Sequence, residues 1–317
     1  MRRWQEVHLN TQNPKPKVQP CQPPLPLQKG DLLRVIAPSG AMRELEAFYK
    51  GIDVWRSRGY RVEISPGIKQ RWGYLAGTDE ERREQLKAAW LDPECRGILC
   101  ARGGYGSARL LENWEWDTNV TPKWLIGFSD VTGLLWSLTH LGISGVHAPL
   151  LTTIAIEPEW SIERLFNWVE GHQIEPITGK GWGGGQVTGI LLPANLTVAT
   201  HLLGTPIQSD LNGVILAIED VGEAPYRIDR MLTQWRMSGA LSQVRGIAIG
   251  RFSQCEAPSG IPSYTVEQVL SDRLGDLGIP VVSNLPFGHD GCNAVLPVGV
   301  MAELDGDKGI LNTVLTL

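Results

Sequence analysis

The sequence predicts an α/β protein with two domains: an N-terminal domain with a parallel sheet and a second, more β-rich α/β domain. In the first half of the chain, short apolar runs alternate with segments whose apolar residues recur at helical spacing. This alternation favours a parallel sheet with helices on both faces. Beyond residue 185 the predicted strands are shorter and more closely spaced. A length of 317 residues accommodates two ordinary cores.

The first 29 residues precede the first predicted strand. They contain six prolines, several glutamines and lysines, and no apolar stretch of the kind found in a secretory signal. Such a composition is typical of a flexible segment. We therefore predict a disordered, proline-rich arm over residues 1–29.

Residues 30–150 are predicted to form the N-terminal domain. Leu45, Phe48, Ile52 and Trp55 recur at the spacing of one helix face, and Thr78 with Glu81 has the pattern of a capping box at a helix start. We predict strands at residues 32–37, 61–64, 97–101 and 123–128, each followed by a helix.

The pattern is less clear over residues 151–185, which end in a run of glycines around Trp182. This region is predicted to be a linker or loop. Residues 186–317 are predicted to form the C-terminal domain, in which Pro225 opens a helix and Gly239 ends it. Its remaining elements are a helix between the first two strands, a helix at 265–274, and strands at 187–192, 213–218, 246–250, 281–283, 294–296, 300–304 and 310–315.

The composition excludes several classes of function. Apolar residues make up 42% of the chain, charged residues 20%, and the net charge is −5, an ordinary globular profile. A mildly acidic chain with no basic stripe argues against nucleic acid as a partner. No apolar run reaches the roughly 18 residues that suggest a membrane span. The five scattered cysteines favour a reducing compartment over disulfides or a zinc site, and no metal-ligand cluster is evident.

The predicted strand at 123–128 ends at Gly127-Phe128-Ser129-Asp130, and helical spacing resumes immediately afterwards. A sharp turn from strand to helix would expose the Ser129 hydroxyl at the carboxyl edge of the sheet, beside the free amides of the helix start. Ser129 is therefore a candidate nucleophile, although Val131 breaks the usual G-x-S-x-G pattern. Alternatively, Ser129 or Asp130 caps the helix.

A serine nucleophile needs a base, and the base needs an acid to orient it. His289, between glycines in a loop, is one candidate base, and His147, at the end of a short strand, is another. A protein with no catalytic histidine is the third possibility. Glu219 and the adjacent Asp220 follow a buried strand and are the candidate acids, or simply a solvated strand end. The order serine, glutamate, histidine matches that of hydrolases with a strand-turn-helix nucleophile.

The glycine loop at 102–106, which follows the predicted strand at 97–101, can be interpreted in three ways. Glycine amides in this loop, together with the Asp130 N–H, could form an oxyanion hole. The loop could also be a simple turn between strand and helix. A phosphate-binding loop is the third interpretation, but neither of the usual glycine patterns is present.

Taken together, four segments resemble the LD-carboxypeptidase family of serine peptidases, which includes the microcin C immunity peptidases. The likeness runs from about Gly30 to the C-terminus. The segments are Arg102-Gly103-Gly104-Tyr105-Gly106, Gly127-Phe128-Ser129-Asp130, residues 219–230 (Glu219-Asp220-Val221-Gly222 through Arg230) and Pro286-Phe287-Gly288-His289.

The resemblance implies a role for each matching residue. Ser129 corresponds to the nucleophile, Glu219 to the acid and His289 to the base, and the backbone N–H groups of Asp130 and Gly104 correspond to the oxyanion hole. Gly103 is the alternative donor. Gly103 is also a candidate for binding substrate. Arg102 and Arg230 are candidates for meeting a substrate carboxylate, although a structural ion pair is the favoured expectation for Arg230.

The resemblance also implies a fold and a substrate. The expected fold is an N-terminal α/β domain with a C-terminal domain of the swivelling type, in a cytoplasmic homodimer that needs no cofactor. The expected activity, which belongs to peptidoglycan recycling, is cleavage between an L-configured diamino-acid centre and the terminal D-alanine of murein tetrapeptides. Hydrolysis of peptidyl or aminoacyl nucleotides is an alternative, as is a non-catalytic protein that binds small molecules. Pro193-Ala194-Asn195 departs from the family's usual Gly-Gly-Asn, which leaves the shape of that loop open.

Overall fold

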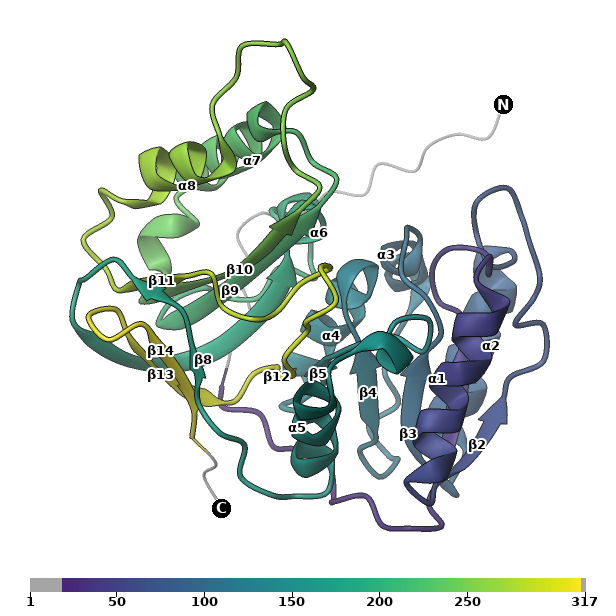
Figure 1. Ribbon diagram of the computed structural model, residues 1–317. Helices are drawn as coiled ribbons and strands as arrows, with labels where there is room; N and C mark the ends of the chain where they lie inside the picture. Colours follow the sequence, from purple (N-terminus) through teal and green to yellow (C-terminus); the bar gives the residue numbers. More distant parts are fainter. Residues whose placement is uncertain (1–18, 315–317) are drawn as a thin grey trace.

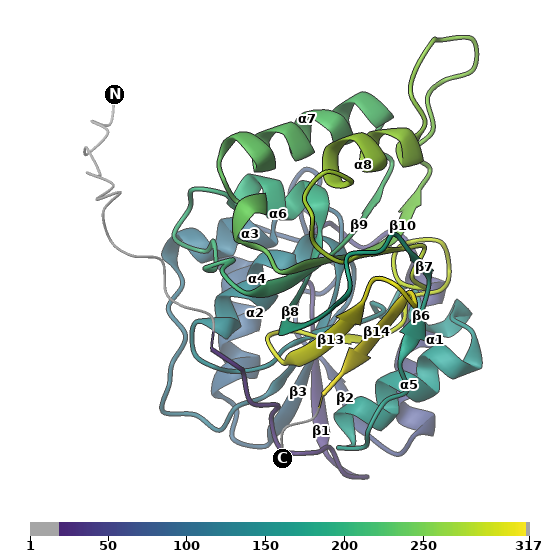
Figure 2. The ribbon, with the colours of Figure 1, turned by 90° about the vertical axis from the view of Figure 1, so that its left-hand side faces the viewer.

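The computed structural model describes residues 19–314 and contains two β-sheets that lie side by side (Figure 1). The first sheet has six strands in the order β12-β5-β4-β3-β1-β2, and the second has eight in the order β6-β14-β13-β8-β9-β10-β11-β7. Helices pack against both sheets (Figure 2). The predicted α/β fold with two domains is confirmed.

The first sheet is parallel from β2 to β5, as the alternation of elements predicts. The helix that follows β1 turns Phe48, Ile52 and Trp55 into the core. The capping box is present at the start of the next helix, where the Thr78 side chain accepts from Glu81 N. The strands are β1 (Leu32–Ile36), β2 (Arg61–Ile64), β3 (Cys95–Cys100), β4 (Trp124–Gly127) and β5 (Val146–His147), and the helices are α1 (Leu45–Ser57), α2 (Asp79–Leu91), α3 (Ser107–Leu110) and α4 (Thr132–Thr139), with 3-10 turns at Leu111–Asn113 and Ser129–Val131.

The second sheet is mixed. Four neighbouring strands, β8 to β11, are parallel, and antiparallel strands complete both edges. Two of its helices, α7 and α8, lie together over one face (Figures 1 and 2). The strands are β6 (Ile177–Thr178), β7 (Lys180–Gly181), β8 (Gln186–Asn195), β9 (Val214–Val221), β10 (Gly246–Ser253), β11 (Val281–Ser283), β13 (Met301–Asp305) and β14 (Ile310–Thr313), and the helices are α6 (Leu196–Leu202), α7 (Pro225–Met237) and α8 (Val266–Leu274), with a 3-10 turn at Leu241–Gln243.

One strand from the end of the chain joins the first sheet. β12 (Leu296–Pro297) pairs antiparallel with β5, so that Leu296 lies opposite His147. The predicted strand at 294–296 therefore belongs to the N-terminal sheet and not to the sheet of residues 186–317. As a result, the loop that precedes β12 must cross from one sheet to the other.

The region predicted to be a linker, residues 151–185, contains a helix of the N-terminal core. A 3-10 turn (Ile154–Ile156) leads into α5 (Glu159–Val169), which buries Leu165 and Phe166. The Phe166 ring meets Trp55 of α1 edge-on, with 5.0 Å between ring centroids. The linker prediction is wrong here because this segment has an amphipathic face, and Phe166 on that face packs against Trp55 of α1.

Part of the predicted disordered arm is packed against the folded protein. Cys21 and Leu27 are buried, and their backbone N–H groups donate to Gly299 O and Val169 O, both at 2.8 Å. The prediction is therefore wrong for residues 19–29, where prolines already restrict the chain and so reduce the entropy lost on ordering. Residues 1–18 of the predicted arm lie outside the described residues.

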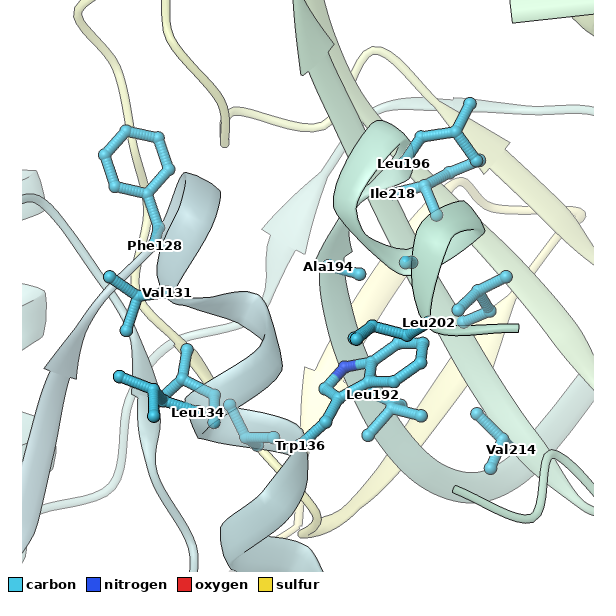
Figure 3. Packing of buried hydrophobic residues seen from close by; sticks show 14 of the residues in the cluster. Phe128, Val131, Leu134, Trp136, Leu192, Ala194, Leu196, Leu202, Val214 and Ile218 are labelled. Carbon is cyan, nitrogen blue, oxygen red and sulfur yellow. The ribbon is translucent and has the colours of Figure 1, made fainter. Parts of the chain in front are cut away.

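A shared apolar core joins the two sheets through α4. Trp136 of α4 lies against Leu192 and Leu202 from the second half of the chain (Figure 3). Its indole Nε1–H donates to Pro193 O at 3.0 Å, and both groups are buried. This packing sets the distance between the end of β4, which carries Ser129, and the end of β9, which carries Glu219.

Candidate active site

Ser129 lies at the sharp turn between β4 and α4. Its backbone has a φ of +64°, in the left-handed region that a non-glycine residue seldom adopts. This is the strained geometry of a nucleophile elbow, in which the hydroxyl is exposed at the end of a buried strand. Neither Ser129 nor Asp130 caps the helix that follows. The Asp130 carboxylate instead accepts from Ser107 N at 2.8 Å, at the start of α3.

Three of the predicted site residues form a continuous chain of hydrogen bonds. His289 Nε2 lies 3.1 Å from Ser129 Oγ, and His289 Nδ1 lies 2.6 Å from Glu219 Oε2. Ser129 comes from the first sheet, Glu219 from β9 of the second, and His289 from the loop that crosses between them. These contacts have the geometry of a serine–histidine–acid triad.

His147 and Asp220, the alternative base and acid, take no part in the contacts between Ser129, His289 and Glu219. His147 is buried between Phe128 and Phe287, with ring centroids 5.4 and 6.1 Å away, and makes no hydrogen bond to the serine. Burial lowers the pKa of His147 to about 3. The Asp220 carboxylate accepts from the N–H and the hydroxyl of Thr197 at the start of α6, at 2.9 and 2.8 Å.

Burial and the Glu219 carboxylate shift the pKa of His289 in opposite directions. Burial alone would lower the pKa of His289, but the adjacent Glu219 carboxylate outweighs it, and the pKa is raised. Glu219 itself is fully buried. Burial raises the pKa of this carboxyl, whereas the His289 imidazole and the Asn195 amide oppose the rise. The pair therefore favours an imidazole whose Nδ1–H is held by the carboxylate, which leaves Nε2 facing Ser129.

The predicted oxyanion loop packs directly against the serine. A Cβ added at Gly103 would lie 3.2 Å from Ser129 Oγ, so a side chain there would crowd the hydroxyl. Gly104 has a φ of +106°, which glycine adopts readily. Within residues 19–314 the Gly104 N–H donates to no protein acceptor. The Asp130 N–H lies in the first turn of its helix, where amides lack intrahelical partners.

Of the two candidate arginines, Arg102 and Arg230, only Arg102 forms an ion pair among the described residues. Arg102 Nε donates to Glu44 at 3.0 Å, and its Nη1 donates to Gly103 O at 3.2 Å, so Arg102 lies along the glycine loop. Arg230 is exposed and sits over the Tyr226 ring, 5.7 Å from its centroid. No ion pair in the described part of the chain includes Arg230, so the expected structural pair is wrong.

Asn195 is a site residue whose role sequence reasoning missed. Its Oδ1 accepts from Val198 N and caps α6, while Nδ2 donates to Glu219 Oε1 at 3.3 Å and to Asp220 Oδ1 at 3.0 Å. An asparagine directly before a helix is a signal for a cap. The segment Pro193-Ala194-Asn195, which departs from the family's usual Gly-Gly-Asn, continues β8 in parallel register with β9.

The described residues were also compared with the requirements of a metal site and of a membrane span. Residues 19–314 contain no group of three or more histidine, cysteine, aspartate or glutamate side chains arranged to hold a metal ion. Across the same residues, every helix is too short or too polar to span a membrane.

Comparison with known proteins identifies the class. The model of the LD-carboxypeptidase N-terminal domain matches residues 33–148, and that of the LD-carboxypeptidase C-terminal domain matches residues 188–304. Together these ranges span most of the chain. The chain therefore belongs to the LD-carboxypeptidase family, which is a family of peptidases and hence of hydrolases.

Individual relatives agree with the family models. The chain is 63% identical over 289 residues to a Synechocystis sp. protein named “Putative carboxypeptidase”, covering 91% of this chain and 96% of that one. It is 31% identical over 294 residues to the murein tetrapeptide carboxypeptidase of Pseudomonas aeruginosa, covering 86% and 93%. The crystal structure of muramoyltetrapeptide carboxypeptidase from Oxalobacter formigenes superposes with a TM-score of 0.79 at 30% identity, covering 89% of this chain and 97% of that one.

Proposed function

We propose that this protein is a serine LD-carboxypeptidase that releases the terminal D-alanine from murein tetrapeptides, a step of peptidoglycan recycling. The observation that carries the proposal is the unbroken contact chain Ser129–His289–Glu219. Relatives named as murein peptidases support the substrate class. The bond cleaved joins the L-configured centre of the diamino acid to D-alanine.

In the proposed reaction, His289 Nε2 accepts the Ser129 proton as Oγ attacks the carbonyl carbon of the scissile bond. The Gly104 and Asp130 N–H groups stabilise the negative oxygen of the tetrahedral intermediate. The C–N bond then breaks, and His289 returns the proton to the departing amine of D-alanine. Glu219 holds the Nδ1–H throughout and stabilises the imidazolium.

A second half-reaction restores the serine. Water attacks the acyl-enzyme carbonyl while His289 Nε2 takes one of its protons. Collapse of the second tetrahedral intermediate breaks the ester bond, and His289 returns that proton to Ser129 Oγ. The products are D-alanine and the shortened peptide with a new carboxylate. Gly103, which packs against Ser129, and Arg102, which lies along the same loop, are proposed to contact the substrate.

The cellular context is part of the same proposal. A cytoplasmic homodimer is the arrangement expected from the family resemblance. Light scattering after gel filtration tests the oligomeric state, and an apparent mass near the monomer value of 34.9 kDa would exclude the dimer.

The test of the activity is to incubate the purified chain with murein tetrapeptide and quantify free D-alanine by chiral chromatography. We expect D-alanine release that falls by about 10³-fold or more in Ser129→Ala. A tetrapeptide ending in L-alanine is the substrate control, and Ser263→Ala, an exposed serine, is the protein control. No release by the wild-type chain, or full activity of Ser129→Ala, would refute the proposal. A peptidyl nucleotide offered in parallel tests the alternative substrate.

A further inference from the structure

The loop that carries His289 has no helix or strand of its own to hold it. It occupies residues 284–295, between β11 and β12. Asn293 lies in this loop and is fully buried. Its side-chain Oδ1 accepts from Gly288 N at 3.1 Å. The Asn293 side chain therefore spans the base of the turn and holds the residue that directly precedes His289.

A buried carboxylate from the other half of the chain holds Asn293 in turn. Glu157, between the 3-10 turn and α5, is 8% exposed. Its Oε2 accepts from Asn293 N at 2.8 Å and from Ser161 Oγ at 3.1 Å. Ser161 Oγ also lies 3.1 Å from Asn293 O. The Glu157 carboxylate thus holds the Asn293 N–H, while the single proton of the Ser161 hydroxyl can be donated either to Glu157 Oε2 or to Asn293 O.

The neighbouring turn of α5 adds a second contact to the same loop. Arg164 Nε donates to Val295 O at 3.2 Å. α5 itself packs on the core of the first sheet through Phe166 and Trp55. These contacts tie the His289 loop to the half of the chain that carries Ser129.

Burying the Glu157 carboxylate in this position has a free-energy cost. Removing a carboxylate from water is costly unless its hydrogen bonds replace hydration, and apolar packing would hold a loop equally well. Burial raises the pKa of Glu157, and the Asn293 N–H opposes that rise. What the carboxylate provides is direction, because one oxygen sets the position of the Asn293 backbone and hence the turn that presents the imidazole.

We propose that Glu157 is a positioning residue for His289, acting through Asn293. The proposal rests on the triad of the proposed function. Without the Glu157 carboxylate the loop would still close, but the His289 imidazole would sample positions away from Ser129 Oγ. A misplacement of about 1 Å between reacting groups can lower a rate by roughly 100-fold.

The direct test compares Glu157→Met, which keeps the length of the side chain but has no oxygen to accept from Asn293 N, with Glu159→Met, which removes an exposed carboxylate two residues along the same segment. We expect kcat for D-alanine release to fall on the order of 10- to 100-fold in Glu157→Met, with KM changed by less than about twofold because substrate contacts are intact. Glu159→Met should match the wild type. Circular dichroism at the assay temperature checks that both variants are folded. Unchanged kcat in folded Glu157→Met would overturn the proposal.

A double-substitution cycle separates positioning from general stability. If Glu157 acts through the imidazole, Glu157→Met should have no further effect in a His289→Ala background. Losses that multiply independently would show that Glu157 acts by another route.

A readout free of murein distinguishes failure of the substrate assignment from failure of this inference. The rate at which a fluorophosphonate probe modifies Ser129 depends on the imidazole but not on the natural substrate. Labelling of the wild type without D-alanine release would refute the proposed substrate and leave the positioning intact. Labelling of Glu157→Met as fast as the wild type would overturn the positioning whatever the substrate.

Discussion

At Ser129 the backbone adopts a conformation that its side chain disfavours. Surrounding packing maintains it: a Cβ added at Gly127, two residues earlier, would lie 2.9 Å from Cys100 Cβ, so the strand has little room to relax. Left-handed backbone costs a non-glycine residue on the order of 1 kcal/mol. The strain points the hydroxyl toward His289 Nε2 and the Gly103–Gly104 loop.

Ser129→Gly should be more stable than Ser129→Ala, because glycine adopts a φ near +64° without a steric penalty. We expect the free energy of unfolding to differ by about 1 kcal/mol in favour of the glycine variant. Urea denaturation followed by circular dichroism measures the difference. Equal stability, or a more stable alanine variant, would show that the turn is not strained.

The charge next to His289 should be visible in the pH dependence of the rate. The neutral imidazole is the proposed base, and its pKa is raised above the ordinary value of 6.5 by Glu219. A raised pKa keeps the ring protonated to higher pH, so the acid limb of kcat/KM should lie above pH 6.5.

Glu219→Gln removes the negative charge that favours the imidazolium. The pKa of His289 should then fall, and the acid limb should move toward lower pH while the maximal rate decreases. Profiles of kcat/KM against pH for both proteins provide the test. An acid limb that stays in place would argue that Glu219 does not set the charge state of His289.

Among the elements, α2 holds the loops at the carboxyl edge of the first sheet. Its Arg82 guanidinium is fully buried and donates to Pro38 O, which follows β1, and to Gly106 O at 2.7 Å, which follows β3. Arg82 also pairs with Asp79 one turn earlier. Burial lowers the pKa of Arg82, and the Asp79 carboxylate opposes this effect. One side chain thus supports the loop that carries Gly104.

Arg82→Met should destabilise the protein because it leaves the buried Pro38 carbonyl without its Arg82 donor and leaves the Gly106 carbonyl only the Arg109 N–H. We expect a loss of about 2–4 kcal/mol in the free energy of unfolding. Lys87→Met, an exposed position on the same helix, is the control and should change stability by less than about 0.5 kcal/mol. Urea denaturation measures both. Equal effects at the two positions would mean that the Arg82 contacts add nothing to stability.

On the scale of the whole molecule, the two halves share a core and a strand. β12 pairs with β5 across the boundary, and α4 packs against β8 and α6. Thr132 Oγ1 accepts from Asn195 N at 3.1 Å beside the Trp136–Pro193 contact. Neither half buries its apolar surface alone, which favours unfolding as a single unit.

Trp136→Phe should lower the stability of both halves together. It removes the donor to the buried Pro193 carbonyl and part of the packing volume, at a cost of about 1–3 kcal/mol. Tryptophan fluorescence and far-ultraviolet circular dichroism should report the same midpoint, shifted equally from the wild type. Trp160→Phe, at a position 45% exposed, is the control. Two separate transitions would contradict the shared core.

Local sequence patterns predicted the helix starts and strands that depend on residues close together in the chain. Thr78 and Glu81 form the capping box, Pro225 opens α7, and the alternation of apolar runs yields the parallel strands of the first sheet. The family motifs identified Ser129, Glu219 and His289 as the residues to examine, since motif residues are recognisable wherever they later meet.

Packing between distant segments decided how the site residues meet. Ser129 and His289 are 160 positions apart, and their contact depends on how α4 seats against the second sheet and how β12 returns to the first. The engagement of Asp220 at α6 and the support of the His289 loop by Glu157 follow from the same long-range packing. Periodicity records which face of an element is apolar, but not which distant element covers it.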